Sequence, residues 1–355
     1  MLGRLEIGGA LKLLYKKEKY RRFNKHKINK LTRRRRYKKL KIRRFNKELE
    51  KYNKLLSSKN DVIKFPRELF LEKNSGDDFF ALIEEALNKS HVILDFSHTK
   101  FVDIGSMCYI RAFVDYLHYV GKKYCIECLS KNRKMRQILQ HVGIKDYKFM
   151  NITYTDIKCW DVRSWKKHSS VNIGQVIIEE ILPKVLKDRI SSDEFKNITP
   201  SLIEILSNCA EHAYLEDDKY NNYYLIAGEY ENTNNKRSGT FAFSIVDLGQ
   251  GFRSSLEKKH NFFKSDKDSK LLEKAINGEV TSKIGGGKDS GRGTGLLSVL
   301  NYINDIGGSL HAYSDKGFYK LYRLDDGRKD TFSKDRKTRM LGSIIEFGLP
   351  ILNKN

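Results

Sequence analysis

Long apolar runs are missing from this sequence, and so is a secretory signal. No run approaches the about 20 apolar residues that a membrane-spanning helix needs. The N-terminus, MLGRLEIGGALKLLY, lacks the compact apolar stretch and the small-residue cleavage site of a signal peptide. Cysteine is scarce as well. The five cysteines are scattered and odd in number, which suits a reducing cytoplasm better than a disulfide framework. We therefore expect a cytoplasmic protein without a transmembrane segment.

The chain does contain enough apolar material for folded domains. Hydrophobic residues make up 39% and aromatic residues 11% of the 355 positions, which excludes a wholly disordered protein. This length fits two domains and an additional segment. We expect a basic arm at 1–59, an α/β domain at 60–150, a connecting helical segment at 151–197 and a second domain at 198–355.

Positive charge is concentrated near the N-terminus. Residues 1–60 hold 23 Lys and Arg against 4 Glu, a net charge of +19, which leaves only +5 of the total +24 for the rest of the chain. The basic stretch runs from 12 to 47, and the apolar spacing from Tyr37 onward predicts a basic amphipathic helix. Three uses of 12–47 stay open: a solvated, partly disordered tail, an arm that binds nucleic-acid phosphates, or a contact with an anionic membrane or an acidic protein.

Residues 60–150 alternate between strand and helix patterns. Amphipathic helices are predicted in DDFFALIEEALNKS, SMCYIRAFVDYLHYVG and NRKMRQILQHVGI, and short strands in HVILDFSHT and KKYCIECLS. Alternation of this kind predicts an α/β domain.

Part of this domain resembles the STAS domain of sulfate transporters and anti-sigma-factor antagonists. The resemblance rests on VILDFSHTKFVDIGSMCYIRAFVDYL, in which a strand leads to a Phe-x-Asp turn that opens a helix. Antagonists of this family carry a phosphorylatable Ser two residues after the turn Asp. Here Gly105 occupies that place after Asp103, and Ser106 comes one position late. The resemblance therefore implies a module for docking to a protein partner or for homodimer formation, rather than a phosphorylation switch.

The segment TPSLIEILSNCAEHAY opens the second domain. Its Thr-Pro pair at 199–200 supplies a good N-cap and a favoured first helical residue, so we expect a helix to start there. Glu204, Asn208 and Glu211 recur at i, i+4 and i+7 and share one face, with His212 beside them. Taken alone, such a polar stripe is typical of the solvated side of a helix.

Two strand patterns follow, YYLIAGEYE and TFAFSIVDLG, as in an antiparallel hairpin. The second strand ends in Asp247, and Gly249 and Gly251 come directly after it. An acceptor at a strand end, followed by glycines that let a ligand approach the backbone, suits recognition of a planar base with an amino group. A turn closed by an Asx-type hydrogen bond explains the same residues.

The stretch GGGKDSGRGTGL at 285–296 has three interpretations as a phosphate-binding loop. A P-loop needs Ser or Thr after its Lys, but Lys288 is followed by Asp289, and Ser282 occupies the place of the first glycine. The SGGxDS loop of ATP pyrophosphatases should follow a buried strand, and EVTSKI is a poor strand. In the third interpretation GRGTGL is a flexible lid that enters the helix LLSVLNYIND, whose first amide groups would meet phosphate oxygens.

In this order the three motifs resemble those of the GHKL ATPases, the superfamily of DNA gyrase, the Bergerat-fold heat-shock chaperones and histidine kinases. The resemblance implies ATP and Mg²⁺ as ligands. It implies that Glu204 is the catalytic carboxylate, that Asn208 binds magnesium and that Asp247 accepts from the adenine amino group. It further implies adenine-pocket glycines at Gly249 and Gly251, lid glycines at Gly291, Gly293 and Gly295, and a supporting hydroxyl at Ser343. Basic residues of this lid could contact the γ-phosphate, although such residues in a glycine-rich loop are more often only solvated; they are Lys283, Lys288 and Arg292.

The implied fold class is α/β. It combines a STAS-like α/β domain with a Bergerat-fold two-layer α/β sandwich, a mixed sheet with helices on one face, preceded by a helical or disordered basic arm.

The resemblance leaves the reaction open. Glu204 could activate water, giving an ATPase, or a protein hydroxyl, giving a Ser/Thr kinase of the anti-sigma-factor type. A two-component histidine kinase is disfavoured, because none of the nine histidines is followed by Asp or Glu. We expect a Mg²⁺-dependent ATPase switch whose nucleotide state controls binding of a protein partner or nucleic acid, with a kinase or a non-hydrolysing ATP-sensing adaptor as alternatives.

Overall fold

The computed structural model describes the chain from residue 62 onward, with gaps. The described residues are 62–127, 133–144, 163–166, 179, 192–215, 217–231, 238–257, 265–280, 295–323 and 327–352. The basic arm at 1–59, most of the connecting segment at 151–197 and the lid segment at 281–294 lie outside them. By their contacts, Val62–Asn355 form one unit, and its fold is α/β, as predicted.

Residues 62–144 form an α/β layer, called here the N-terminal layer, as their alternating pattern predicts. Its elements in chain order are β1 (Val62–Lys64), β2 (Glu68–Leu69), α2 (Asn74–Asn88), β3 (His91–Asp95), β4 (Phe101–Val102), α3 (Ile104–Tyr119), β5 (Lys123–Glu127) and α4 (Arg133–His141). Strands β1, β3 and β5 pair in parallel in this order, and β2 and β4 form a short parallel pair. Parallel neighbours need crossover connections, which α2 and α3 supply.

Helix α3 is apolar on almost every side. Of its 16 residues, 11 are buried. The carboxylate of Asp103 caps the first turn, accepting from the amide of Ser106 at 2.7 Å and from the amide of Leu71 at 2.6 Å. Since a helix of this kind cannot leave a face in water, it must lie between two packed layers.

Residues 163–352 contribute a seven-stranded sheet, called here the large sheet, with strand order β11-β10-β9-β12-β8-β7-β6. Its strands are β6 (Arg163–Lys166), β7 (Asn222–Glu231), β8 (Ser238–Asp247), β9 (Gly308–Ser314), β10 (Gly317–Arg323), β11 (Lys329–Asp335) and β12 (Ser343–Leu352). Every strand pair is antiparallel, whereas the sequence analysis expected a mixed sheet. The physical reason is that β7–β8, β9–β10 and β10–β11 are hairpins, and β12 returns between β8 and β9.

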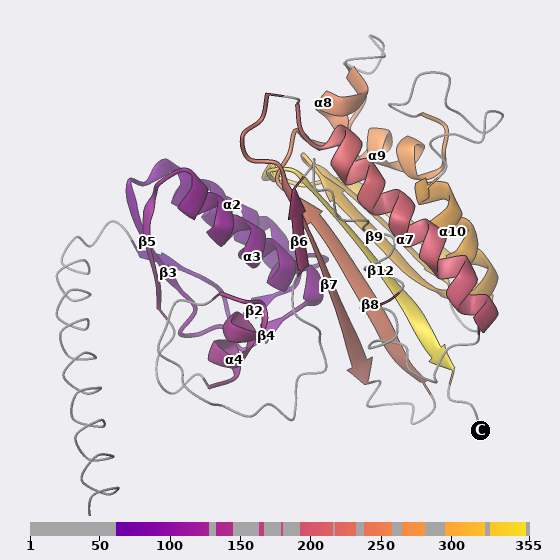
Figure 1. Ribbon diagram of the computed structural model, residues 1–355, viewed down its shortest axis with the longest axis horizontal. Coiled ribbons are helices and arrows are strands. Elements are labelled where there is room, and N and C mark those ends of the chain that lie inside the picture. The colour runs from indigo at the N-terminus through magenta and orange to yellow at the C-terminus, as the bar shows by residue number, and fades with distance from the viewer. Residues whose placement is uncertain are drawn as a thin grey trace, which may run out of the picture. The chain divides into compact units, whose positions relative to one another are not determined.

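The helices that follow residue 191 cover one face of the large sheet (Figure 1). They are α7 (Ser192–His212), α8 (Gly251–Glu257), α9 (Asp268–Ile276) and α10 (Gly295–Ile306). Their apolar residues, such as Leu202 and Leu300, share one core with Phe241, Phe243 and Ile245 of β8. None of the described helices is long and apolar enough to cross a membrane.

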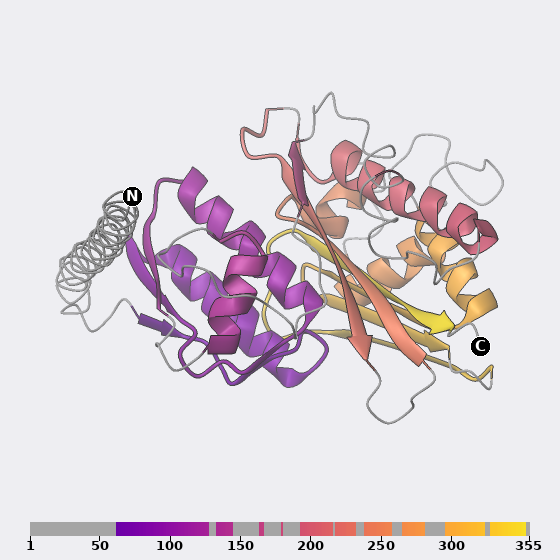
Figure 2. The same cartoon turned by 60° about the horizontal axis from the view of Figure 1, so that its bottom comes forward.

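The N-terminal layer covers the opposite face. Helix α3 packs on β7, β8 and β12, and Figures 1 and 2 both show it on the side of the sheet away from α7 and α10. Because strand residues alternate between faces, Tyr224, Val246 and Ile344 join the core of this layer, while their chain neighbours join the other core. The five strands from β10 to β7 of the large sheet are therefore buried on both faces.

Helix α7 begins earlier than predicted. It starts at Ser192, seven positions before Thr199, and Pro200 lies inside it. The expectation that the Thr-Pro pair starts the helix is therefore wrong. Pro200 lacks an amide hydrogen and so removes one internal hydrogen bond, but it does not end the helix.

Candidate functional site

A cavity lies between the helical layer and the large sheet. Helix α7 contributes Asn208, Cys209 and His212 to its wall, and β12 contributes Ser343 and Ile345. The remaining wall comes mainly from Asp247 at the end of β8 and from the following helices, with Gly251, Phe252, Ser255, Leu256, Ala275 and Leu296. Most of these side chains are apolar, so the few polar groups stand out as the groups that could orient a ligand.

Asp247 is the central polar group of this cavity. Its side chain is nearly buried, with 3% of the residue exposed. One carboxylate oxygen accepts from the amide of Gly249 at 2.9 Å, and the other accepts from the hydroxyl of Ser343, with the thiol of Cys209 3.8 Å away. Burial raises the pKa of Asp247 to about 6, although the hydrogen bonds from Ser343 and Gly249 oppose this rise.

The two glycines after Asp247 are required by close backbone contacts. A Cβ atom on Gly249 would lie 2.0 Å from the carbonyl oxygen of Ala213, and Gly251 has a φ of +78°. A Cβ atom on Gly251 would also lie 2.7 Å from a carboxylate oxygen of Asp315. The amide of Gln250 donates to Ala213 at 2.7 Å, so this turn is fixed against the end of α7.

The polar stripe of α7 divides between the cavity and the surface. Asn208 lines the cavity, and so does His212 one turn later. Glu204, one turn before Asn208, is partly exposed and lies outside the described lining. The side chain of Glu211 is 52% exposed. The structure thus brings Asn208, Asp247, Gly251 and Ser343 together.

The predicted lid is described only at its end. Gly291, Gly293, Lys283, Lys288 and Arg292 lie outside the described residues. Gly295 is the first residue of α10, and the next residue, Leu296, lines the cavity. The N-terminus of α10, with amide groups that have no partner inside the helix, therefore begins beside the cavity.

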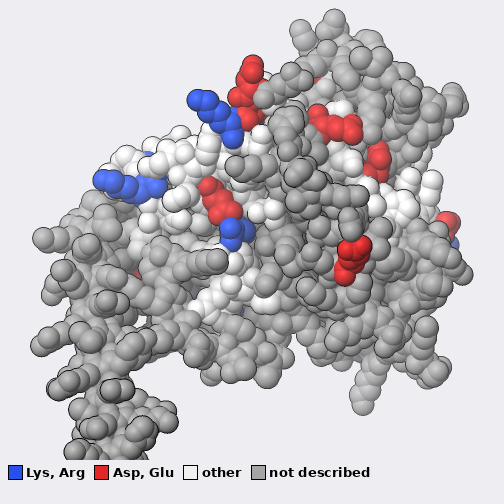
Figure 3. All heavy atoms as spheres, in the orientation of Figure 1, with Lys and Arg blue, Asp and Glu red and all other residues white. Residues whose placement is uncertain are grey.

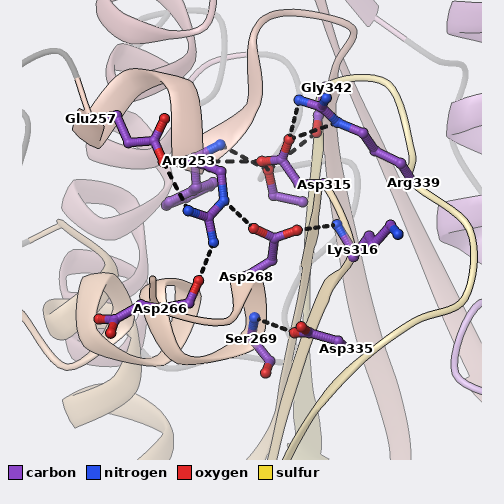
Figure 4. Close-up of polar contacts among 12 residues, drawn as sticks. Arg253, Glu257, Asp266, Asp268, Ser269, Asp315, Lys316, Asp335, Arg339 and Gly342 are labelled. Atoms are coloured by element: carbon purple, nitrogen blue, oxygen red, sulfur yellow. Dashed lines mark hydrogen bonds and ion pairs between the residues drawn. The ribbon is translucent and has the colours of Figure 1, made fainter. Parts of the chain in front are cut away.

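A polar network behind α8 was not predicted (Figure 4). The guanidinium group of Arg253 donates to Glu257 at 2.8 Å, to Asp268 and to the carbonyl oxygen of Asp266. Asp268 also accepts from the amide of Lys316 at 3.0 Å. These bonds join α8, the start of α9 and the turn between β9 and β10. No sequence signal marks them, because the partners are scattered over more than 60 positions and follow no periodic pattern.

Asp315 links the same network to the glycine turn. It has a φ of +54°, and its carboxylate accepts from Arg339 at 2.7 Å and from the amide of Arg253 at 3.3 Å. The hydroxyl of Ser314 accepts from the amide of Phe252 at 2.8 Å. The first turn of α8, which forms one wall of the cavity, is thereby held on the large sheet.

This arrangement suits a flat, largely apolar ligand that carries a hydrogen-bond donor and an anionic tail. The donor would meet Asp247, and the tail would meet the N-terminus of α10. No cluster of metal-binding side chains occurs within the described ranges, so a cation here would need oxygen ligands from the bound molecule besides Asn208. No family model, curated protein or solved structure matches this chain.

Proposed function

We propose that this chain is a Mg²⁺-dependent ATP-binding regulatory protein of the GHKL type, in which nucleotide state controls the binding of a partner. One observation carries the proposal: the buried carboxylate of Asp247, held by Ser343 and Gly249, faces an apolar cavity that Asn208 also lines. The order of these residues along the chain resembles that of the three motifs of that superfamily.

The described residues have the chemistry that adenine recognition needs. Asp247 would accept from the exocyclic amino group, and Phe252, Leu256 and Ile345 would pack on the base. Most of this wall is apolar, so a ligand without the donor would leave the carboxylate unpaired and bind less well.

The described residues that would face the phosphates of a bound nucleotide are compatible with Mg²⁺ binding. Magnesium in nucleotide sites usually takes one or two protein oxygens, with the rest from phosphates and water. Asn208 offers one such oxygen, and the start of α10 offers amide groups to phosphate oxygens. In this proposal Glu204, on the same face of α7, orients the water that attacks the γ-phosphate.

The test is incubation of the full chain with Mg²⁺ and γ-labelled ATP, following released phosphate and label on protein together. The ATPase proposal expects phosphate release that is lost in Glu204→Ala and in Asn208→Ala. Labelled protein instead of phosphate indicates a kinase. ATP binding without either product indicates an ATP sensor, and no binding at all contradicts the whole proposal.

A specific observation bears on the kinase alternative. Ser106, the residue nearest to the acceptor position of anti-sigma antagonists, is fully buried, and its hydroxyl donates to the carbonyl oxygen of Leu69 at 3.1 Å. An acceptor in this position cannot reach a phosphate donor without unfolding α3. A kinase activity would therefore act on a separate protein.

For the basic arm we propose nucleic-acid phosphates as the partner. Its net charge of +19 within residues 1–60 exceeds that of the rest of the chain. On the face shown in Figure 3, the described Lys and Arg side chains lie singly or beside acidic ones and form no basic patch. Binding to an arbitrary DNA duplex should fall steeply with salt and should be lost when residues 1–59 are removed, whereas unchanged binding by that shorter chain contradicts this role.

We also propose a cytoplasmic location, because the chain has few and scattered cysteines. Of these, Cys108 and Cys209 are buried thiols.

A further inference from the structure

The segment Arg336–Ser343, called here the strap, connects the N-terminal layer with the candidate nucleotide site. It lies between β11 and β12. Its first residue packs in the N-terminal layer, and its last residue donates to Asp247. Contacts along the strap link the N-terminal layer to the carboxylate of Asp247 in the large sheet.

The first anchor of the strap is Arg336. This side chain is buried, and the residue is 5% exposed. Its guanidinium carbon lies 5.2 Å from the ring centre of Phe80 of α2, 4.9 Å from that of Tyr313 and 5.2 Å from that of Phe318. It also donates to the carbonyl oxygen of Leu71. Cation–π contacts with rings of both layers fix this end of the strap where the layers meet.

The second anchor is Tyr109 of α3. Its ring is fully buried, in edge contact with Phe79 and Phe80, and its hydroxyl donates to the carbonyl oxygen of Leu341 at 3.0 Å. On the other side of the strap, the amide of Met340 donates to the carbonyl oxygen of Asp315 at 2.9 Å. The peptide group that precedes Gly342 is thus held by a hydrogen bond from the N-terminal layer.

Gly342 lies in close backbone contact with Asp247. Its φ is +78°, and a Cβ atom on it would lie 2.0 Å from the carbonyl oxygen of Asp247. The following residue, Ser343, pairs with Asp247 across β12 and β8 and donates its hydroxyl hydrogen to the carboxylate. Because the backbones are in contact here, a shift of the Leu341 carbonyl displaces the donor that orients the carboxylate.

We propose that Tyr109 is a positioning residue for base recognition, acting through Leu341, Gly342 and Ser343 on Asp247. This inference rests on the proposed function. It gives the N-terminal layer a role in nucleotide selection, although that layer contributes no residue to the described wall of the cavity.

The test is Tyr109→Phe in the full chain, with Kd for ATP and for inosine triphosphate measured by calorimetry in Mg²⁺. Inosine has a carbonyl oxygen where adenine has its amino group, so the ratio of the two Kd values reports how well Asp247 is oriented. Loss of one hydrogen bond that positions a carboxylate should lower the preference for ATP by about two- to tenfold. Affinity for inosine triphosphate should change less than affinity for ATP.

Tyr220→Phe is the matched control. Tyr220 is also buried, and its hydroxyl also donates to α3, to the carbonyl oxygen of Ala112 at 3.2 Å. Within the described part of the chain, no hydrogen bond or ring contact joins Tyr220 to the strap. The preference for ATP should stay at the wild-type value in this variant. An equal loss of preference in both variants, or no loss in Tyr109→Phe, overturns the positioning role.

Two further measurements keep the outcome clear. If Tyr109→Phe does not fold, Arg336→Lys tests the strap from its first anchor, since it keeps the charge and loses the planar stacking, and an unchanged ratio there overturns the proposal. A wild-type protein that binds neither nucleotide overturns the proposed function itself. The wild-type titration therefore separates the two failures.

Discussion

The surroundings of the Asp247 carboxyl group disfavour its ionised form. Burial raises its pKa from 3.8 to about 6. A folded pKa above the unfolded value means that this group favours folding below about pH 4 and that the contribution is lost as pH rises through 6. At neutral pH the ionised group thus costs on the order of 3 kcal/mol relative to its protonated form. A cost of this kind is expected where a ligand needs the acceptor.

The raised pKa of Asp247 predicts that selection of adenine depends on pH. Protonation removes an acceptor, so the preference for ATP over inosine triphosphate should be constant above about pH 7 and fall severalfold by about pH 5. Calorimetric titrations of both nucleotides at several pH values measure it. The shared triphosphate cancels from the ratio. A preference that is flat across this range contradicts an ionised Asp247 as the acceptor.

Asn208 predicts a second effect at the residue scale. Asn208→Ala should weaken ATP binding about tenfold or more in Mg²⁺ and little in EDTA, because one metal ligand is lost. Glu211→Ala is the matched control, since Glu211 belongs to the same polar stripe but its side chain is 52% exposed. Equal weakening with and without Mg²⁺ argues against a metal role for Asn208.

At the element scale, the position of α8 depends on Arg253. This side chain joins α8 to α9 through Asp268 and to its own last turn through Glu257, and the side chain is 21% exposed. The preceding residue, Phe252, lines the cavity, and its backbone amide donates a hydrogen bond to the hydroxyl of Ser314. One wall of the cavity is therefore fixed by polar bonds made behind it.

Arg253→Met should lower both stability and ATP affinity. The substitution keeps the apolar stem but leaves Asp268 and Glu257 without the cation, which should reduce the free energy of unfolding by about 1–3 kcal/mol. Denaturant unfolding and ATP titration measure the two effects. Lys270→Met is the control, because its pair with Glu273 on α9 is exposed and away from α8, and it should change neither. Lower stability with unchanged ATP affinity contradicts the positioning of α8 by this network.

Elements with one apolar stripe or a clear alternation could be predicted from the sequence. The helices α2 and α10 and the hairpin of β7 and β8 lie where their patterns place them. Helix α3 also lies where it was predicted, but it is buried on almost every side rather than along one stripe. The edge of the large sheet formed by β9, β10 and β11 could not be predicted. Strand β10 is buried on both faces, with Phe318 toward one core and Tyr319 toward the other, while β11 is largely exposed, so neither shows the alternation of a half-buried strand.

The candidate site, too, could be predicted from the sequence only in part. Asp247, Gly251, Asn208 and Ser343 meet in one cavity, and ordered short motifs were enough to select them. Arg253, Asp315 and the strap residues before Ser343 were missed, because their partners are distant in the sequence and only tertiary packing brings them together.

On the scale of the whole molecule, the five strands from β10 to β7 of the large sheet have apolar residues buried on both faces. Tyr224, Val246 and Ile344 pack in the core of the N-terminal layer, and Tyr220 and Tyr109 make hydrogen bonds between that layer and the rest. Because α3 packs on three strands of the large sheet, we expect the N-terminal layer to move together with that sheet rather than as a separate domain. The position of that layer and the shape of the cavity are parts of one packing arrangement.

Because the N-terminal layer packs on the large sheet, residues 62–355 should unfold in one cooperative transition. Removing the N-terminal layer would expose apolar groups on five strands of the large sheet, β7, β8, β9, β10 and β12, so neither part should unfold alone. Differential scanning calorimetry of a chain that begins at Val62 measures it. ATP should move the single transition to higher temperature. Two separate transitions, only one of them shifted by ATP, contradict a shared core.

The most direct test of the central claim is calorimetric titration of ATP into the full chain in Mg²⁺, beside Asp247→Asn. This variant keeps the size of the side chain and replaces the carboxylate that Ser343 and Gly249 orient. The account predicts saturable binding with one site per chain, a preference for ATP over inosine triphosphate, and loss of that preference in Asp247→Asn. Absence of binding in the wild type, or equal preference in both proteins, contradicts an adenine nucleotide site at Asp247.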